Sequence, residues 1–361
     1  MSRLRALADT LRGMEGGNAG NALHQAGALL LRPERVAHTP THLQVEVATL
    51  CNLACVMCPR TIALARARDR RERAAWRRRL SLSVFVRIVD QFPALRTLTL
   101  HGIGEPLLNP DLPEMVAHAG GRGIAVRFTS NGTLLTPEVR ERLIDAGLAE
   151  LTVSMDGATA ETYERIRPGA RFAEVRANVA GLVALRNRLG RVRPRVSLAM
   201  VVFRENVGEA PPMVELAAEL GVDELRFSPL EPPTRAEAAM MCSAAEWRAA
   251  MAAARAAAER RGVRLFVRGP SAPPPLVQLR PQAAPPPKRT DRCLAPWRTA
   301  VVTLDGEVMP CCNIHHPDHG MGNVLAEGFG AVWNGARYRA FRRLIRRRGK
   351  PPEPCRMCPE F

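Results

Sequence analysis

The sequence is poor in aromatic residues and has no long apolar run. Aromatic side chains make up 4% of its 361 residues, so it lacks the interleaved rings on which nucleic acid bases stack. Its apolar run at residues 26–31 is far shorter than the roughly 20 residues that span a bilayer. The N-terminus also lacks the basic, apolar and small-residue regions of a signal peptide. These absences predict a cytoplasmic protein with no membrane partner, and they argue against nucleic acid as a partner.

Positive charge is abundant, and nearly all of it comes from arginine. The formal net charge is +17, and dense arginine runs lie at residues 66–79 and 339–350. Such runs can attract an anionic substrate, although solvated helix faces in an arginine-rich protein give the same pattern. We favour solvated faces over nucleic acid binding and leave an anionic small substrate open.

Strand-like and helix-like segments alternate from residue 43 onward. We expect strands at 43–47, 95–100, 124–128, 151–154, 196–202 and 224–227, and helices at 83–91, 113–119, 137–146, 173–189 and 212–220. This alternation predicts an α/β fold with a parallel sheet covered by helices. Six units rather than eight predict a partial (β/α)6 TIM-like barrel, whose chemistry gathers at the carboxyl ends of the strands.

The chain divides into four expected segments. We expect a helical N-terminal preface at 1–40, the barrel core at 41–230 and a helix with a proline-rich linker at 231–289. Within the third segment we expect an alanine-rich helix at 236–261 and a strand at 263–267. A small cysteine-rich C-terminal auxiliary-cluster domain is expected at 290–361.

The nine cysteines favour metal binding over disulfides, because a reducing cytosol keeps thiols free. Eight of them fall into two groups, one towards each end of the chain. The first group is Cys51, Cys55 and Cys58, at C-x3-C-x2-C spacing directly after the first expected strand. Iron–sulfur cubanes normally take four cysteines, so three leave one iron open to a small molecule. A zinc site or ordinary buried cysteines are the alternatives, although zinc prefers four closed ligands and no fourth ligand lies nearby.

The run Cys-Asn-Leu-Ala-Cys-Val-Met-Cys at residues 51–58 resembles the signature of the radical S-adenosylmethionine (SAM) enzymes. The resemblance implies a [4Fe-4S] cluster whose open iron binds SAM. It also implies reductive cleavage of SAM to a 5′-deoxyadenosyl radical, which abstracts a hydrogen from a substrate.

Further motifs follow the later strands in the order that this family shows. Gly104-Glu105-Pro106 resembles the element that receives the SAM amino group, although Ile103 replaces its first glycine. By the same resemblance, Asn131 in Thr-Ser-Asn-Gly-Thr (residues 129–133) and Ser154 in Ser-Met-Asp-Gly (residues 154–157) would line the SAM ribose and carboxylate. Arg167, or Arg165 as the runner-up, would pair with that carboxylate, and residues 199–206 would lie against the adenine. Taken singly, these residues could also be ordinary capping and turn residues.

The second cysteine group resembles the SPASM/twitch extension of radical SAM enzymes. Gly-Asn-Val at 322–324 and Val-Trp-Asn at 332–334 accompany it. Five cysteines can ligate one auxiliary [4Fe-4S] cluster but not two. The resemblance implies the ligands Cys293, Cys311, Cys355 and Cys358, with Cys312 a doubtful spare. Zinc also suits this spacing, and the histidines of a polar loop, His315, His316 and His319, are simpler to explain as loop residues.

The combined motifs predict a radical SAM oxidoreductase or isomerase. We expect a small-molecule substrate that is dehydrogenated or epimerised, because only about forty residues precede the first expected strand. Peptide or protein maturation is the alternative. A non-catalytic metal- or nucleic-acid-binding protein is a more distant one. Flavodoxin or ferredoxin would supply electrons. Cys242, the cysteine outside both groups, is either a buried small hydrophobe, which we favour, or a hydrogen donor to a substrate radical.

Overall fold

The computed structural model of the chain describes residues 19–231, 237–268, 293–312, 319–346 and 355. Its strands are β1 (His42–Val45), β2 (Thr97–Leu100), β3 (Ala125–Ser130), β4 (Glu150–Ser154), β5 (Arg195–Val202), β6 (Glu224–Pro229), β7 (Leu265–Val267), β8 (Thr299–Val302) and β9 (Val308–Met309). The expected proline-rich linker, the first 18 residues of the preface, His315, His316 and Cys358 lie outside the described residues.

The helices alternate with these strands as the sequence predicts. They are α2 (Ala19–Leu31), α3 (Pro59–Arg66), α4 (Arg70–Ala75), α5 (Leu82–Val89), η2 (Pro106–Leu108), α6 (Leu112–Gly121), α7 (Pro137–Asp145), α8 (Ala160–Ile166), α9 (Phe172–Arg188), η3 (Val207–Glu209), α10 (Ala210–Glu219), η4 (Glu237–Met240), α11 (Ala244–Arg261), α12 (Ala295–Arg298), α13 (Val324–Glu327), α14 (Phe329–Trp333) and α15 (Ala336–Arg346). Those labelled η are 3-10 turns.

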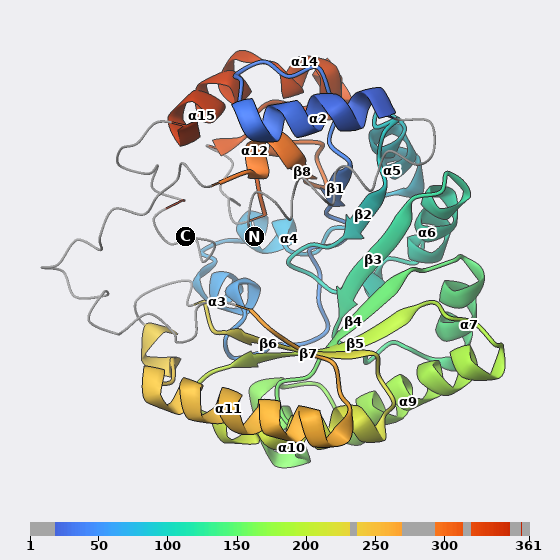
Figure 1. Cartoon of the computed structure of the whole chain (residues 1–361), viewed down its shortest axis with the longest axis vertical. Coiled ribbons are helices and arrows are strands. Elements are labelled where there is room, and N and C mark those ends of the chain that lie inside the picture. Colours follow the sequence, from blue (N-terminus) through green and yellow to red (C-terminus); the bar gives the residue numbers. More distant parts are fainter. Residues whose placement is uncertain (1–18, 232–236, 269–292, 313–318, 347–354, 356–361) are drawn as a thin grey trace, which may run out of the picture.

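The strands form one sheet in the order β7-β6-β5-β4-β3-β2-β1-β8-β9. From β7 through β8 every neighbouring pair is parallel, and only β9 is antiparallel. Helices α5, α6, α7, α9, α10 and α11 lie along the outside of the curved sheet (Figure 1). The predicted α/β fold with a partial TIM-like barrel is therefore confirmed, and the carboxyl ends of β1–β6 share one rim.

The sheet extends beyond the six expected units on both sides. β7 adds to β6 on one edge. On the other edge β8, from the C-terminal region, pairs with β1 in the register His42↔Thr299. The C-terminal region is thus joined to the barrel sheet through main-chain hydrogen bonds. The four-segment division at residues 40, 230 and 289 stays a prediction.

Local capping explains where individual helices begin. Thr136 caps α7 as expected, its side chain accepting a hydrogen bond from the amide of Val139. The alanine-rich helix begins at Ala244 rather than near residue 236, because Ser243 and Glu246 form a capping box. A capping box satisfies two N-terminal amides reciprocally, which fixes the start of a helix. η4 occupies the residues that were expected to open that helix.

The N-terminal segment packs on the C-terminal region rather than on the barrel helices. The indole nitrogen of Trp297 donates to the carbonyl of Pro33 at 2.7 Å, and that of Trp333 donates to the carbonyl of His38 at 2.9 Å. The buried guanidinium of Arg342 donates to the carbonyl of Glu34 at 3.0 Å. Figure 1 shows α2 beside α12, α14 and α15. The preface is therefore a structural part of the region that carries the second cysteine group.

A continuous apolar core lies between the sheet and its outer helices. Alternate residues of β3 are buried, among them Val126 and Phe128, and they belong to one apolar cluster with Met115 and Val116 of α6. Among the described residues, no helix has both the length and the apolar character that crossing a bilayer requires.

Candidate radical SAM site and auxiliary cysteine region

The first cysteine group lies on the loop between β1 and α3. Cys58 is the N-cap residue of α3, and Pro59 occupies the first position of that helix. Main-chain bonds hold the loop against the end of α8: the amide of Ala54 donates to Pro168, and that of Val56 donates to Ile166. Buried and exposed residues alternate from Asn52 to Met57. The loop is therefore fixed by backbone contacts that do not depend on a ligand.

The sulfur atoms of this loop receive hydrogen bonds from the surrounding elements. Cys51 Sγ accepts from the amide of Leu53 at 3.5 Å and from Asn131 Nδ2 at 3.9 Å. Cys55 Sγ accepts from Arg167 Nη1 at 3.8 Å. Burial raises the pKa of Cys51, and it raises the pKa of Cys55 to about 11 although Arg167 opposes the rise. Thiols that ligate a metal are deprotonated, and donors aimed at sulfur suit the thiolate form.

The residues fit an iron–sulfur cluster by the chemistry of their donor set. Cys51, Cys55 and Cys58 are free thiols. The charge of Cys58 raises the pKa of both Cys51 and Cys55, so the three cysteines lie close together. Across the described residues, no three His, Cys, Asp or Glu side chains converge closely enough to hold a single metal ion. Thiolate ligands of a cubane stand at the corners of a four-iron cube rather than around one ion.

Glu105 is buried at the end of β2, where it joins three segments. Its Oε1 accepts from Ser130 Oγ at 2.8 Å and from the amide of Leu107 at 3.0 Å, and its Oε2 accepts from the amide of Asn131 at 2.7 Å. It caps the 3-10 turn η2. Burial raises its pKa, and no described residue forms an ion pair with it. A buried carboxylate without a cation suits an ammonium group, so Glu105 fits the predicted contact with SAM.

The glycines before Glu105 serve a packing role. A Cβ atom on Gly102 would lie 2.6 Å from the carbonyl oxygen of Ala48, and one on Gly104 would meet the carbonyl of Leu50. The amide of Gly104 donates to Ala48, and that of Glu105 donates to Leu50. Glycine is required at these positions because the loop after β2 passes directly against the backbone that leads into the cysteine loop.

Asn131 connects the end of β3 to the cysteine loop. Besides Cys51, its Nδ2 donates to Asn52 Oδ1 at 2.9 Å, and its Oδ1 accepts from Thr133 Oγ1 at 2.7 Å. Asn52 in turn donates to Thr133 Oγ1. The structure therefore brings Asn131 together with the first cysteine group. Asn52 and Thr133 were not among the predicted site residues, although both stand within the quoted motifs.

Arg167 and Arg165 have different surroundings. Arg167 is buried and donates to Asp156 through Nε at 2.7 Å. Burial alone would lower its pKa, but the nearby charge of Asp156 raises it overall. Arg165 is exposed on α8 and pairs with Glu205 and Glu161 on the surface. Arg167 is therefore the arginine placed at the strand ends, and Arg165 is not.

Asp156 is the residue that the sequence-based reasoning missed. Its carboxylate holds Arg167 on one side and accepts from the amide of Val201 at 2.8 Å on the other, so it joins the ends of β4 and β5. Ser154, which was predicted instead, is half-buried, and its hydroxyl has no hydrogen-bond partner among the described residues. Asn206 bonds the carbonyls of Asp156 and Val201 and closes the turn after β5. The aspartate in Ser-Met-Asp-Gly at residues 154–157 was the sequence feature that could have identified it.

Tyr163 lies one helical turn before Arg167 on α8. It is fully buried, and its hydroxyl has no hydrogen-bond partner among the described residues. Burial raises its pKa to about 12, and Arg167 and Asp156 act on it electrostatically. No sequence motif singled it out.

The second cysteine group is only partly described. Cys293 precedes α12, and its carbonyl accepts from Arg32 Nη2 at 3.2 Å. Cys311 follows β9 and, like Phe341 of α15, packs against the small apolar cluster of Val301 and Met309. Cys355 is buried and Cys312 is exposed.

Two buried polar atoms on α15 lack a hydrogen-bond partner among the described residues. They are the hydroxyl of Tyr338 and Nη2 of Arg342. Burial raises the pKa of Tyr338, and the charge of Cys311 adds to the rise. A buried hydroxyl without a partner, such as that of Tyr338 near Cys311, fits the charged thiolates of an auxiliary cluster.

Cys242 lies apart from both groups. It is 4% exposed and packs in the apolar core between η4 and α11. Its electrostatic neighbours are Glu246 and Arg204.

Two family models match the chain. That of the radical SAM superfamily matches residues 45–217, and that of SPASM, an iron–sulfur cluster-binding domain, matches residues 293–359. The chain therefore belongs to the radical SAM superfamily and carries a SPASM-type region. The family implies [4Fe-4S] clusters and SAM as cofactors, and the donor sets described above fit both.

Among its relatives, the mycofactocin maturase MftC of Mycobacterium tuberculosis is 32% identical over 56% of this chain and 48% of its own length. The PqqA peptide cyclase of Ruegeria pomeroyi is 29% identical over 90% of this chain and 81% of its own length. The chain spans about half the length of several curated relatives that it matches. The crystal structure of Streptococcus suis SuiB bound to precursor peptide SuiA has a TM-score of 0.65 at 14% identity, covering 94% of this chain and 75% of SuiB.

Proposed function

We propose that the chain is a radical SAM maturase that modifies a peptide. The observation that carries the proposal is its similarity to PqqA peptide cyclases over nine-tenths of the chain and four-fifths of the relative. The similarity to the maturase MftC points the same way. These relatives favour peptide or protein maturation, the alternative that the sequence left open, over the dehydrogenation or epimerisation of a small molecule.

Glu105, Arg167, Asn131 and Ser154 are the proposed SAM contacts. Cys51, Cys55 and Cys58 would hold the [4Fe-4S] cluster, which when bound would supply the electron for the reductive cleavage of SAM that starts hydrogen abstraction from the substrate. The buried Glu105 carboxylate would accept the SAM ammonium group and so offset its own desolvation. A guanidinium has five N–H donors, and Asp156 and Cys55 engage three of those of Arg167. The remaining two can bind the SAM carboxylate.

Asp156 orients this arginine rather than binding SAM itself. Its Oδ2 receives both Nε and Nη2, which fixes the guanidinium plane. The same arginine donates to Cys55. Arg167 therefore links the position of one cluster ligand to that of the proposed contact with the SAM carboxylate. Cys293, Cys311, Cys355 and Cys358 are the proposed auxiliary ligands. Flavodoxin or ferredoxin is the proposed electron donor.

The test uses anaerobically reconstituted enzyme, SAM and dithionite, with short peptides encoded beside its gene as candidate substrates. We expect one peptide to change mass, with 5′-deoxyadenosine formed in proportion. Mass spectrometry of the peptide and chromatography of the nucleoside measure the two products. Cys55→Ala should abolish both, because the cluster loses a ligand.

Two outcomes would contradict the proposal in different ways. Deoxyadenosine formation that persists in the Cys55→Ala variant would mean that the site is misassigned. Unmodified peptides together with turnover of a small metabolite would remove the peptide substrate and leave the radical SAM chemistry intact.

A further inference from the structure

The segment between the cysteine loop and α5 carries a concentrated positive charge. We call residues 59–79 the arginine platform; it contains α3, α4 and the turn that follows them. It holds nine arginines against two acidic residues, Asp69 and Glu72. The platform begins directly after Cys58, so it lies next to the loop that would hold the SAM-binding cluster.

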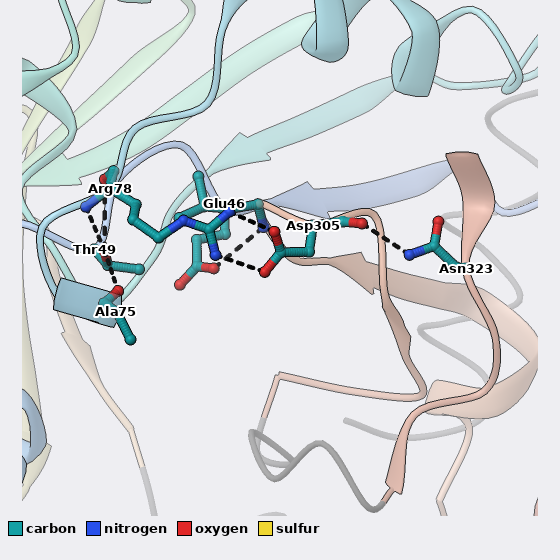
Figure 2. Close-up of polar contacts among 7 residues, drawn as sticks. Glu46, Thr49, Ala75, Arg78, Asp305 and Asn323 are labelled. Carbon is teal, nitrogen blue, oxygen red and sulfur yellow. Dashed lines mark hydrogen bonds and ion pairs between the residues drawn. The ribbon is translucent and has the colours of Figure 1, made fainter. Parts of the chain in front are cut away.

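The platform is anchored at its end to both the barrel and the C-terminal region. The amide of Thr49, after β1, donates to the carbonyl of Arg78, and the amide of Arg78 donates to the hydroxyl of Thr49. That hydroxyl in turn donates to the carbonyl of Ala75 at 2.9 Å. The guanidinium of Arg78 extends to both carboxylate oxygens of Asp305 (Figure 2). The carbonyl of Asp305 is held in turn by Asn323 Nδ2 at 2.8 Å. Figure 2 shows Arg78 bridging the two regions beside Glu46.

The beginning of the platform is anchored as well. Arg60 is buried, and its Nε donates to the carbonyl of Thr49 at 2.7 Å. Arg66, at the end of α3, pairs with Glu237 of η4 at 3.4 Å. Contacts at several points along its length fix the direction in which the platform presents its other arginines.

Five arginines of the platform face solvent without a counterion. Arg70, Arg71, Arg73, Arg77 and Arg79 are exposed, and none forms an ion pair with any described residue. The large apolar side chains that are exposed in the described parts of the chain all lie elsewhere, outside residues 59–79. The platform is thus positively charged and held in place by its contacts, and it exposes no large apolar side chain to which a partner could bind.

We propose that the arginine platform docks an acidic one-electron carrier protein that reduces the SAM-binding cluster. Each reductive cleavage of SAM consumes one electron that must come from outside the chain. It leaves the carrier, which is oxidised by one electron, and enters the cluster; the transfer itself neither forms nor breaks a bond. The inference rests on the radical SAM chemistry and not on the identity of the substrate.

The surface fits a carrier better than a peptide or a nucleic acid. Electron-transfer complexes are small and transient, and opposite charge steers their encounter. A stably bound peptide needs apolar anchors or an edge strand, and the exposed side chains of the platform offer no large apolar anchor. Single-stranded nucleic acid needs aromatic rings for stacking, and Trp76, which is half-buried, is the platform's single aromatic residue.

The experiment compares a protein donor with a small one. The variant Arg70→Glu/Arg71→Glu/Arg77→Glu reverses three platform charges. Two of these changes fall in the first turn of α4, where glutamate suits the helix dipole, so the helix should persist. The control variant Arg188→Glu/Arg191→Glu/Arg193→Glu reverses three exposed arginines at the opposite end of the barrel, before β5. Both are reconstituted anaerobically and mixed with reduced flavodoxin or with dithionite.

We expect flavodoxin to reduce the cluster of the platform variant about tenfold or more slowly than that of wild type, because electrostatic steering changes association rates by about 10 to 1,000-fold. Stopped-flow absorbance measures the rate. Dithionite should reduce wild type and both variants at rates within about twofold, and the control variant should keep the flavodoxin rate. Raising the salt concentration should slow wild type and not the platform variant.

Three outcomes overturn the proposal. If flavodoxin reduces both variants equally slowly, the net charge of the protein and not the platform controls the rate. If dithionite reduces the platform variant as slowly as flavodoxin does, the platform maintains the structure of the cluster site. An unchanged flavodoxin rate, with a 20-nucleotide RNA binding wild type but not the platform variant in fluorescence anisotropy, assigns the surface to nucleic acid. Cluster reduction needs no peptide, so a failed peptide substrate leaves the result interpretable.

Discussion

Arg167 and Asp156 form a buried ion pair in which Nε and Nη2 of the arginine both approach Oδ2 of the aspartate, at 2.7 and 2.6 Å. The exposed fractions of the two side chains are 9% and 0%. The pair links the turn after β4 to Cys55, a proposed cluster ligand, because the same guanidinium donates to that sulfur. Removing either charge would leave the other buried without its partner.

We expect Asp156→Asn to lower the free energy of unfolding by about 3–5 kcal/mol, the cost of leaving a buried charge unpaired. Urea denaturation of the apo protein measures it. The control is Asp90→Asn, which removes an exposed carboxylate from its pairs with Arg122 and His118. Exposed pairs contribute about 1 kcal/mol or less. Equal losses in the two variants would contradict the buried role of Asp156.

The two cysteine groups predict a specific iron content. Reconstituted wild type should bind about eight irons per chain on the basis of four per cubane. Replacing Cys51, Cys55 and Cys58 together with alanine should leave about half of that iron, held by the second group. Colorimetric iron analysis and metal mass spectrometry check the count. Tightly bound zinc in place of the remaining iron would eliminate the auxiliary cluster.

His38 should make stability depend on pH. Burial lowers its pKa from 6.5 to about 4, against an opposing bond with the carbonyl of Trp297. The unfolded chain binds a proton near pH 6.5 and the folded chain only near 4, so acid favours unfolding within that window. We expect the unfolding free energy to fall by about 3 kcal/mol between pH 6.5 and pH 4. His38→Gln should remove that part of the pH dependence in denaturation curves, and an unchanged slope would contradict it.

Local patterns made much of the barrel predictable. The alternating strands and helices, the cap at Thr136 and the placement of motifs after strands depend on short-range periodicity and turn chemistry. The resemblance of residues 51–58 to a family signature then identified the chemistry. Glu105, Asn131 and Arg167 are found at the strand ends as expected, although their roles toward SAM stay predictions.

Long-range relationships could not be predicted. β8 pairs with β1 although Thr299 and His42 are far apart in sequence, and periodicity carries no information about such partners. The packing of Trp333 against the segment around His38 has the same origin. Asp156 was missed because an Asp-Gly pair is an ordinary turn signal, and only the fold reveals Arg167 beside it.

Cys242 provides a test of hydrogen donation to a substrate radical. We expect Cys242→Ala to keep both the peptide product and 5′-deoxyadenosine, because the thiol is 4% exposed and packs in the core. A donor must reach the substrate radical, and a buried small residue of this kind serves packing. Product analysis by mass spectrometry distinguishes the roles. A variant that still forms deoxyadenosine but yields no product would assign the hydrogen-donor role to Cys242.

Gly104 should control how firmly the cysteine loop is held. A Cβ atom at this position would lie 2.6 Å from the carbonyl oxygen of Ala48 and 2.7 Å from the carbonyl carbon of Thr49. Both are backbone atoms that cannot turn aside, so Gly104→Ala should cost about 1–3 kcal/mol of stability through overpacking. The displaced loop should also bind less iron at the first cluster, while the second cysteine group keeps its share. Gly121→Ala is the control: it meets nothing within 4 Å at the end of α6, so it should be neutral or stabilise by up to about 1 kcal/mol. Thermal unfolding and iron analysis of both variants measure the difference, and wild-type iron content in Gly104→Ala would show that the loop does not depend on this close approach.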